Sequence, residues 1–204
     1  MSKKQIHLAA HFPGVNNTTV WSDPESGSQT DFASFVHFAR TAERGLFDFL
    51  FLAEGLRLRE HRGKIHDLDV VGRPDTLTVL NAIAAVTEHL GLGGTINTTF
   101  NEPYELARQF ASLDHLSGGR AAWNLVTSSD AFTGENFRRG GFLKPEERYD
   151  RAQEILDAAT ERAPRLPVVG RGDADDDQYV QTLLEELRAR AASIPPWPFE
   201  GGAS

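Results

Sequence analysis

Short apolar runs alternate with amphipathic stretches four times over the first 160 residues, and this order limits the possible folds more than any other feature of the chain. Each apolar run is too short for a typical helix and fits a strand that is buried on both faces. In the amphipathic stretches, apolar residues recur every three or four positions, as they do along one face of a helix. The predicted strands span residues 5–12, 47–53, 92–99 and 121–127, and the predicted helices begin near residues 31, 74, 103 and 145.

Capping and helix-breaking residues support these boundaries. Thr30 is placed to cap the first helix and Gly45 to end it. Pro74, Pro103 and Pro145 each suit the first turn of a helix, where the missing N–H of proline costs nothing.

Strands that alternate with helices form parallel sheets with right-handed crossovers, either in an open doubly wound sheet or in a barrel. The barrel is favoured because no Gly-x-Gly-x-x-Gly motif follows a strand and because polar residues gather just after the strands. A complete (β/α)₈ barrel takes about 250 residues. The sequence therefore predicts an α/β fold in which residues 1–160 form the N-terminal half of a TIM-type barrel.

The segment 161–204 does not continue the alternation. It contains an acidic patch at residues 173–177, one predicted helix over residues 178–192, and a proline-rich end. We expect a divergent tail that is partly disordered around the acidic patch.

Composition excludes several classes of function. The chain has no cysteine, which excludes disulfides, thiolate nucleophiles, zinc–thiolate sites and iron–sulfur clusters. Its net charge of −8 would repel a phosphate backbone, so no nucleic-acid partner is expected. No apolar run approaches the roughly 18 residues of a membrane span, and the N-terminus does not resemble a signal peptide. We expect a cytoplasmic protein that does not bind membranes.

Polar residues at the ends of the predicted strands are the candidate site. His11 ends the first strand and is the catalytic candidate, and Glu54 directly follows the second. Thr98, Thr99 and Asn124 offer neutral hydrogen-bonding groups that would suit the edge of a flavin ring. Glu54 is equally compatible with an exposed loop acid, and residues such as Thr98, Thr99 and Asn124 are equally common in ordinary βα turns. No metal site is expected, because His61 and His66 lack a recognised ligand spacing.

Hydrolase and P-loop motifs are absent from the sequence, which favours chemistry carried out by a bound organic cofactor. Residues 11–14, 47–54 and 97–104, and above all the run Ser-Leu-Asp-His-Leu-Ser-Gly-Gly-Arg-Ala-Ala-Trp-Asn at 112–124, resemble the bacterial-luciferase-like flavin monooxygenases. The resemblance is to their nitrilotriacetate monooxygenase and dibenzothiophene-sulfone monooxygenase branch, and it extends from residue 5 to about residue 160.

The resemblance implies a two-component enzyme that binds FMN in its reduced form, FMNH₂, uses O₂ as co-substrate and oxygenates a small organic molecule. It also implies a separate NAD(P)H-dependent flavin reductase as partner and a homo-oligomeric assembly. By position, the resemblance assigns Glu54, Thr98, Thr99, Asn124 and Tyr149 to flavin binding. Two features depart from the family pattern: Glu54 stands in place of an aspartate, and Pro145 stands where many relatives have a histidine.

Family members are considerably longer than this chain, so the resemblance further predicts a truncated and inactive monooxygenase. Two other interpretations stay open: a non-enzymatic half-barrel that binds or assembles with another chain, and an inert product of a damaged gene.

Overall fold

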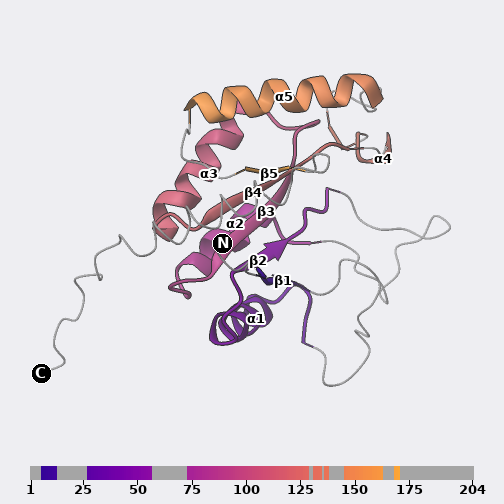
Figure 1. Cartoon of the computed structure of the whole chain (residues 1–204). Helices are drawn as coiled ribbons and strands as arrows, with labels where there is room; N and C mark the ends of the chain where they lie inside the picture. The colour runs from indigo at the N-terminus through magenta and orange to yellow at the C-terminus, as the bar shows by residue number, and fades with distance from the viewer. Residues whose placement is uncertain are drawn as a thin grey trace, which may run out of the picture.

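The computed structural model describes residues 6–12, 27–56, 73–128, 131–134, 136–137, 145–162 and 168–170. Within these ranges one sheet of parallel strands forms the centre of the molecule, in the spatial order β1-β2-β3-β4-β5 (Figure 1). The strands are β1 (Ala9–His11), β2 (Phe49–Leu52), β3 (Gly91–Asn97), β4 (Ala121–Val126) and β5 (Val168–Gly170). Because spatial order follows chain order without a reversal, the sheet winds in one direction, as a barrel does and a doubly wound sheet does not.

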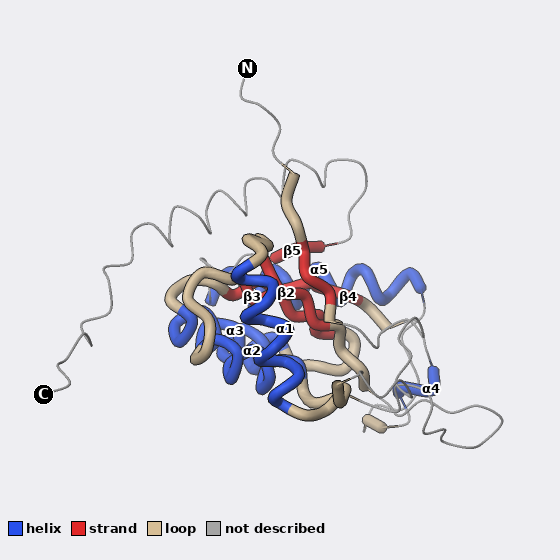
Figure 2. Tube along the Cα trace, turned by 90° about the horizontal axis from the view of Figure 1, so that it is seen from below, coloured by secondary structure: helices blue, strands red, loops and turns tan. Residues whose placement is uncertain are grey.

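Helices cover one face of this sheet. They are α1 (Phe32–Arg44), α2 (Thr76–Ala84), α3 (Pro103–Ser117) and α5 (Pro145–Arg162), while the single turn α4 (Ala131–Gly134) follows β4 along the chain. Figure 2 shows α1, α2 and α3 side by side along the sheet, and α5 packs on α3. The structure therefore confirms the predicted alternation of strands and helices up to residue 162.

Most predicted boundaries hold to within a few residues. The expectation that Thr30 caps the first helix is wrong, because Asp31 is the residue that precedes its first turn. An informative shift occurs at α2. This helix begins at Thr76 and not at Pro74, because the Asp75 side chain accepts a hydrogen bond from the backbone N–H of Thr78 at 2.7 Å. The carboxylate satisfies an N–H that has no partner inside the helix, and this fixes the first turn.

A fifth strand is the main difference from the sequence prediction. β5 pairs in parallel with β4, with Trp123 opposite Val168 and Leu125 opposite Gly170. The expectation that the alternation stops near residue 160 is therefore wrong for residues 168–170. The sequence analysis missed this strand because it comprises only three residues, too few for periodicity to show. The predicted acidic patch and the predicted helix at 178–192 lie outside the described residues.

The two faces of the sheet differ in what they contact. Leu50, Leu92 and Trp123 are fully buried in the core that the helices cover. Gly94 also faces the helices, since a Cβ atom there would lie only 2.9 Å from Leu80 Cδ1. Side chains alternate along a strand, so Gly93, two residues before Thr95, points to the opposite face. We call this opposite face the inner face, because it would line the interior of a barrel.

Arg120 is buried just before β4 and stabilises the amino-terminal edge of the sheet through hydrogen bonds. Its guanidinium donates hydrogen bonds of 2.7–3.0 Å to the backbone carbonyls of Ser117, Leu90, Ala84 and Thr87 and to the Thr87 hydroxyl. Burial lowers the pKa of Arg120, and the negative charges of Glu43 and Glu88 oppose this shift. The buried hydrogen bonds of Arg120 thus stabilise the amino-terminal edge. Ligand sites of barrels lie at the opposite, carboxyl-terminal edge.

Candidate functional site

Hydrogen bonds join the ends of β2 and β3 at the carboxyl-terminal edge of the sheet. Glu54, two residues after β2, accepts a hydrogen bond through Oε2 from the backbone N–H of Asn97 at 2.8 Å. Burial raises the pKa of Glu54 to about 7, although the Asn97 N–H favours the ionised form and the negative charge of Asp75 opposes it. A carboxyl group at this edge therefore exchanges its proton near neutral pH.

Thr98 and Thr99 tie the end of β3 to the end of β4. The Thr98 hydroxyl donates to the carbonyl oxygen of Val126 at 3.1 Å, and the Thr98 N–H donates to the same oxygen at 2.9 Å. The Thr99 hydroxyl accepts from the backbone N–H of Ser128 at 3.1 Å. Both threonines are buried. Their hydroxyl groups thus already bond to the backbone, which gives these residues a structural role beside their predicted role toward flavin.

Asn124 lies on β4 opposite Thr95 of β3, and its Nδ2 donates to the Thr95 hydroxyl at 3.0 Å. The preceding residue, Trp123, points to the helices and donates from Nε1 to the carbonyl oxygen of Ile96. Alternation along the strand therefore places the half-buried Asn124 on the inner face. The structure brings Asn124 into one polar group with Thr95.

His11 ends β1 and lies beside the aromatic ring of Phe51, with 5.4 Å between the ring centroids. Its side chain is exposed overall, but burial of part of the ring and the positive charge of Arg73 lower its pKa. Arg73 donates to the carbonyl oxygen of Ala53 at 2.9 Å, which holds the guanidinium at the end of β2. His11 is therefore a mainly neutral imidazole at neutral pH.

Tyr149 is more exposed to solvent than the two candidate threonines. Its side chain is 69% exposed on α5, whereas Thr98 and Thr99 are enclosed by neighbours. The contact from α5 to the strand ends is made by the adjacent Arg148, which donates to the carbonyl oxygen of Ser128 at 2.9 Å.

Sequence reasoning missed Thr95 and Asn97, which lie on β3 before the predicted threonines. Asn97 is 5% exposed and Thr95 is 8% exposed. The available signal was the alternation along β3, because polar residues two positions apart near the end of a strand share one face.

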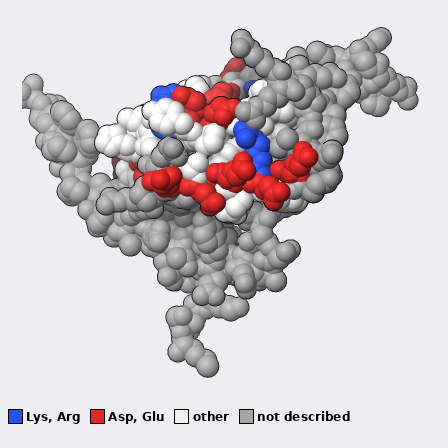
Figure 3. Space-filling model, turned by 90° about the horizontal axis from the view of Figure 1, so that it is seen from above, with Lys and Arg blue, Asp and Glu red and all other residues white. Residues whose placement is uncertain are grey.

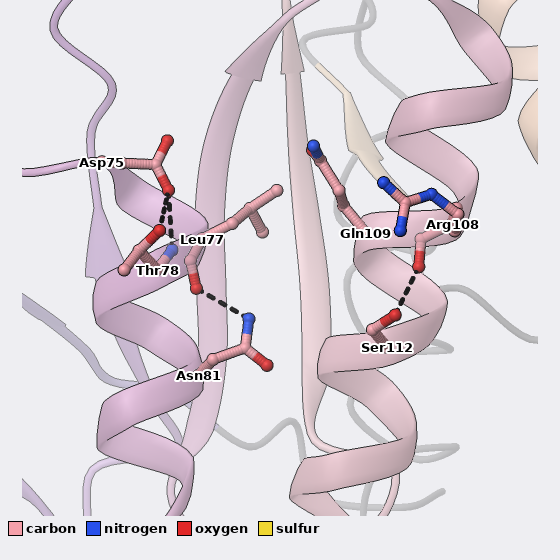
Figure 4. A pocket seen from close by; sticks show the side chains of 7 residues that line it. All are labelled: Asp75, Leu77, Thr78, Asn81, Arg108, Gln109 and Ser112. Atoms are coloured by element: carbon pink, nitrogen blue, oxygen red, sulfur yellow. Dashed lines mark hydrogen bonds between the residues drawn. The ribbon is translucent and has the colours of Figure 1, made fainter.

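A polar groove of about 200 Å³ lies elsewhere, between α2 and α3 on the helix-covered side (Figure 4). Asp75, Thr78 and Asn81 line it from α2, and Arg108, Gln109 and Ser112 line it from α3. Its hydrogen bonds stay within each helix, such as Asn81 Nδ2 to the Leu77 carbonyl oxygen at 2.8 Å. Ligands of parallel barrels bind at the carboxyl ends of the strands, so this groove is not the candidate site.

Among the described residues on the face that Figure 3 presents, the charged side chains are mostly acidic. Glu147, Asp150, Glu154 and Asp157 are exposed on α5, which lies uppermost in Figure 1. This exposed surface would repel the long phosphate backbone of a nucleic acid. Among the described residues, no three His, Asp or Glu side chains are placed to hold a metal ion, and His61 and His66 lie outside that part of the chain. No helix in the described ranges is long and apolar enough to cross a membrane.

Comparison with known proteins identifies the family. The family model of the luciferase-like monooxygenases matches residues 15–197. This match extends further toward the C-terminus than the resemblance seen in the sequence, which ends near residue 160. The chain belongs to this family. It is 43% identical over 168 residues to a dibenzothiophene-sulfone monooxygenase of Rhodococcus erythropolis, strain XP, an alignment that covers 76% of this chain and 37% of that protein. It is 43% identical over 189 residues to nitrilotriacetate monooxygenase component A of Aminobacter aminovorans, covering 84% of this chain and 42% of that protein.

A solved structure agrees with this assignment. DmoA from Hyphomicrobium sulfonivorans matches with a TM-score of 0.65 and 34% identity, covering 78% of this chain and 36% of that one. The partial barrel predicted from the sequence is confirmed. The chain spans less than half the length of the curated relatives that it matches.

Proposed function

We propose that the chain binds reduced FMN at the carboxyl-terminal edge of its sheet and acts as part of a flavin-dependent monooxygenase. The observation that carries the proposal is the polar group at the ends of three neighbouring strands: Glu54 after β2, Thr95 and Asn97 on β3, and Asn124 on β4. Family membership supports it, because relatives at 43% identity are named monooxygenases.

The residues at this edge fit the chemistry of a flavin ring. The edge of the ring carries carbonyl oxygens and an N–H group, which need neutral donors and acceptors. Asn124 supplies an amide, and Glu54 can accept or donate a proton near pH 7. Next to them the inner face is apolar, because the rings of Phe49 and Phe51 lie against Gly93, and such a surface would help to exclude water from a bound ring.

When bound, reduced flavin would supply the electrons that activate O₂ for oxygenation of a small organic substrate. This chain's contribution would be to hold the ring, to keep water from it, and to hold a proton on Glu54. His11 would contribute a neutral imidazole beside Phe51. Thr98 and Thr99 would keep the ends of β3 and β4 in register, and Tyr149 would reach the flavin phosphate.

A separate NAD(P)H-dependent flavin reductase is the proposed partner. The support is that one relative is named a component A, which implies a second component. We further propose that the chain works in the cytoplasm and forms a homo-oligomer.

A second candidate is a half-barrel that binds or assembles with another chain. It is favoured by one observation: within the described residues, β1 and β5 each pair with one neighbouring strand only. Outermost strands such as these can pair with a further strand from another chain. This module would have no need of flavin.

Thermal unfolding of the purified chain with FMN separates the two candidates, using the oxidised and the dithionite-reduced cofactor. A flavin site predicts stabilisation by reduced FMN of about 2.7 kcal/mol at one hundred times the dissociation constant. Asn124→Ala should weaken binding by about 1 kcal/mol through the loss of a buried hydrogen bond. Asn81→Ala, in the groove between α2 and α3, is the matched control and should bind as the parent does. A parent chain that melts identically with and without flavin would overturn the proposed function.

A further inference from the structure

Asn97 makes three hydrogen bonds to described residues at the carboxyl-terminal edge of the sheet. Its backbone N–H donates to Glu54 Oε2 at 2.8 Å. Its side-chain Oδ1 accepts from the backbone N–H of Thr99 at 2.6 Å, and its carbonyl oxygen accepts from Asn101 Nδ2 at 2.7 Å. Asn97 is also buried, with only 5% of its surface exposed. The three bonds and this burial restrict the residue to one conformation.

The contact with Thr99 also decides which way the side-chain amide points. A backbone N–H can only donate, so the atom that faces it must be the oxygen of the amide. The Nδ2 amine is therefore turned away from Thr99. Within the described residues this amine makes no hydrogen bond.

The position of Asn97 along β3 shows which face of the sheet this residue lies on. Gly94 faces α2, so Gly93, Thr95 and Asn97 share the inner face. Thr95 on that face already bonds to Asn124. Asn97 is the next residue on the same face and lies beside Glu54.

We propose that Asn97 is a ligand-binding residue whose Nδ2 amine donates a hydrogen bond to a carbonyl oxygen of an uncharged polar ring held at this edge. The inference rests on the proposed function and adds to it a residue and the ligand group that this residue recognises. Glu54 and Asn97 then form a matched pair, in which the carboxyl group meets an N–H of the ligand and the amide meets a carbonyl. The donor is oriented before binding, so little conformational entropy is lost when the ligand arrives.

Two variants separate this role from a purely structural one. Asn97→Ser keeps a side-chain oxygen for the Thr99 N–H but removes the Nδ2 amine, and its hydroxyl proton sits on a shorter side chain. Asn97→Asp keeps the shape and the oxygen, removes the donor and adds a negative charge beside Glu54. Asn81→Ser, on α2, is the matched control. The probe is reduced FMN, with affinity measured by titration and the unfolding midpoint measured without ligand.

The proposal predicts that Asn97→Ser unfolds at the parent's midpoint and binds reduced FMN about five- to tenfold more weakly. Asn97→Asp should bind more weakly still, and its affinity should fall as pH rises because two neighbouring carboxylates then ionise. Asn81→Ser should match the parent. If the parent binds flavin and both Asn97 variants bind equally well, the assignment of Asn97 is overturned while the proposed function stands. If the parent does not bind flavin at all, both are overturned.

Discussion

Leu46 has a left-handed backbone conformation, with φ of 58°, immediately after the residue that caps α1. Its N–H donates to the carbonyl oxygen of Glu43, and the N–H of Phe47 donates to that of Ala42, both at 3.0 Å. This is the helix ending in which glycine usually occupies the left-handed position. Here glycine stands one residue earlier, at Gly45, and leucine takes the unfavourable conformation.

We predict that Leu46→Gly stabilises the protein by about 0.5–1 kcal/mol, because relief of the left-handed strain exceeds the added freedom of the unfolded chain. Little packing is lost, since Leu46 is 84% exposed. The free energy of unfolding from urea titration measures the effect. Leu116→Gly is the control: this side chain is 68% exposed but lies within α3, so the change should destabilise by about 1 kcal/mol. Destabilisation by both variants would contradict the strain at Leu46.

Glu54 should make stability fall as pH rises. Burial raises its pKa to about 7 in the folded protein, so between pH 4.5 and 7 the folded state binds a proton that the unfolded state has released. Its contribution is therefore complete below pH 4.5 and is lost as pH approaches 7. We predict that Glu54→Gln flattens this part of the stability curve, by a total on the order of 3 kcal/mol. Urea titrations of both proteins from pH 5 to 8 measure it, and parallel curves would show that Glu54 titrates normally.

At the scale of single residues, the sequence predicted which strand ends carry polar groups but not which polar groups stay available. Thr98 and Thr99 looked like binding residues, yet both hydroxyls bond to the backbone of the neighbouring strand end. Asn97 drew no notice because it precedes them inside the strand. Such differences arise from hydrogen bonds between β3 and β4, which local sequence patterns do not contain.

Glu43 connects α1 to the segment that enters β3. Its Oε1 accepts hydrogen bonds from the backbone N–H groups of Glu88, His89 and Leu90 at 2.7–3.0 Å. Burial acts to raise the pKa of Glu43, but these three N–H groups and the positive charge of Arg120 lower it overall. One carboxylate thereby satisfies three amides that no helix or strand pairs.

We predict that Glu43→Ala destabilises the protein by about 2–3 kcal/mol, because three N–H groups lose a charged acceptor. Since the pKa is lowered in the folded state, the parent keeps this contribution above about pH 4.5 and loses it as pH falls further. The difference between the two proteins in urea titrations should therefore shrink in acid. Glu88→Gln is the control, because that side chain is 87% exposed, and it should leave stability unchanged. Equal loss in both variants would contradict the role of Glu43.

At the scale of elements, the sequence was sufficient for α3, which carries its own signals at both ends. α3 begins at Pro103 and is followed by Gly118 in the left-handed conformation, as these residue types predict. β5 had no such signals, because a strand of three residues exists only through its pairing with β4. Local patterns thus predict elements that can be recognised alone and miss those that the sheet induces.

At the scale of the whole molecule, stability should be graded across the sheet. β3 is buried along all seven residues and pairs over Leu92–Asn97 with β4, whereas β1 pairs with β2 only over Ala9–His11. Sheet regions with more burial and pairing open less often. In the candidate site, we therefore expect the backbone to open less often at Asn97 and Asn124 than at His11.

We predict that backbone amides of β3 and β4 exchange with solvent at least tenfold more slowly than those of β1, which corresponds to a difference of about 1.4 kcal/mol in opening free energy. Hydrogen–deuterium exchange followed by mass spectrometry, at a fixed pH, measures it. Reduced FMN should slow exchange further near residues 97–99, because the ligand would bind only the closed form. The long helix α5 provides an internal reference that does not belong to the sheet. Equal exchange in β1 and β3 would show that the sheet opens as one unit, and the graded description would then be wrong.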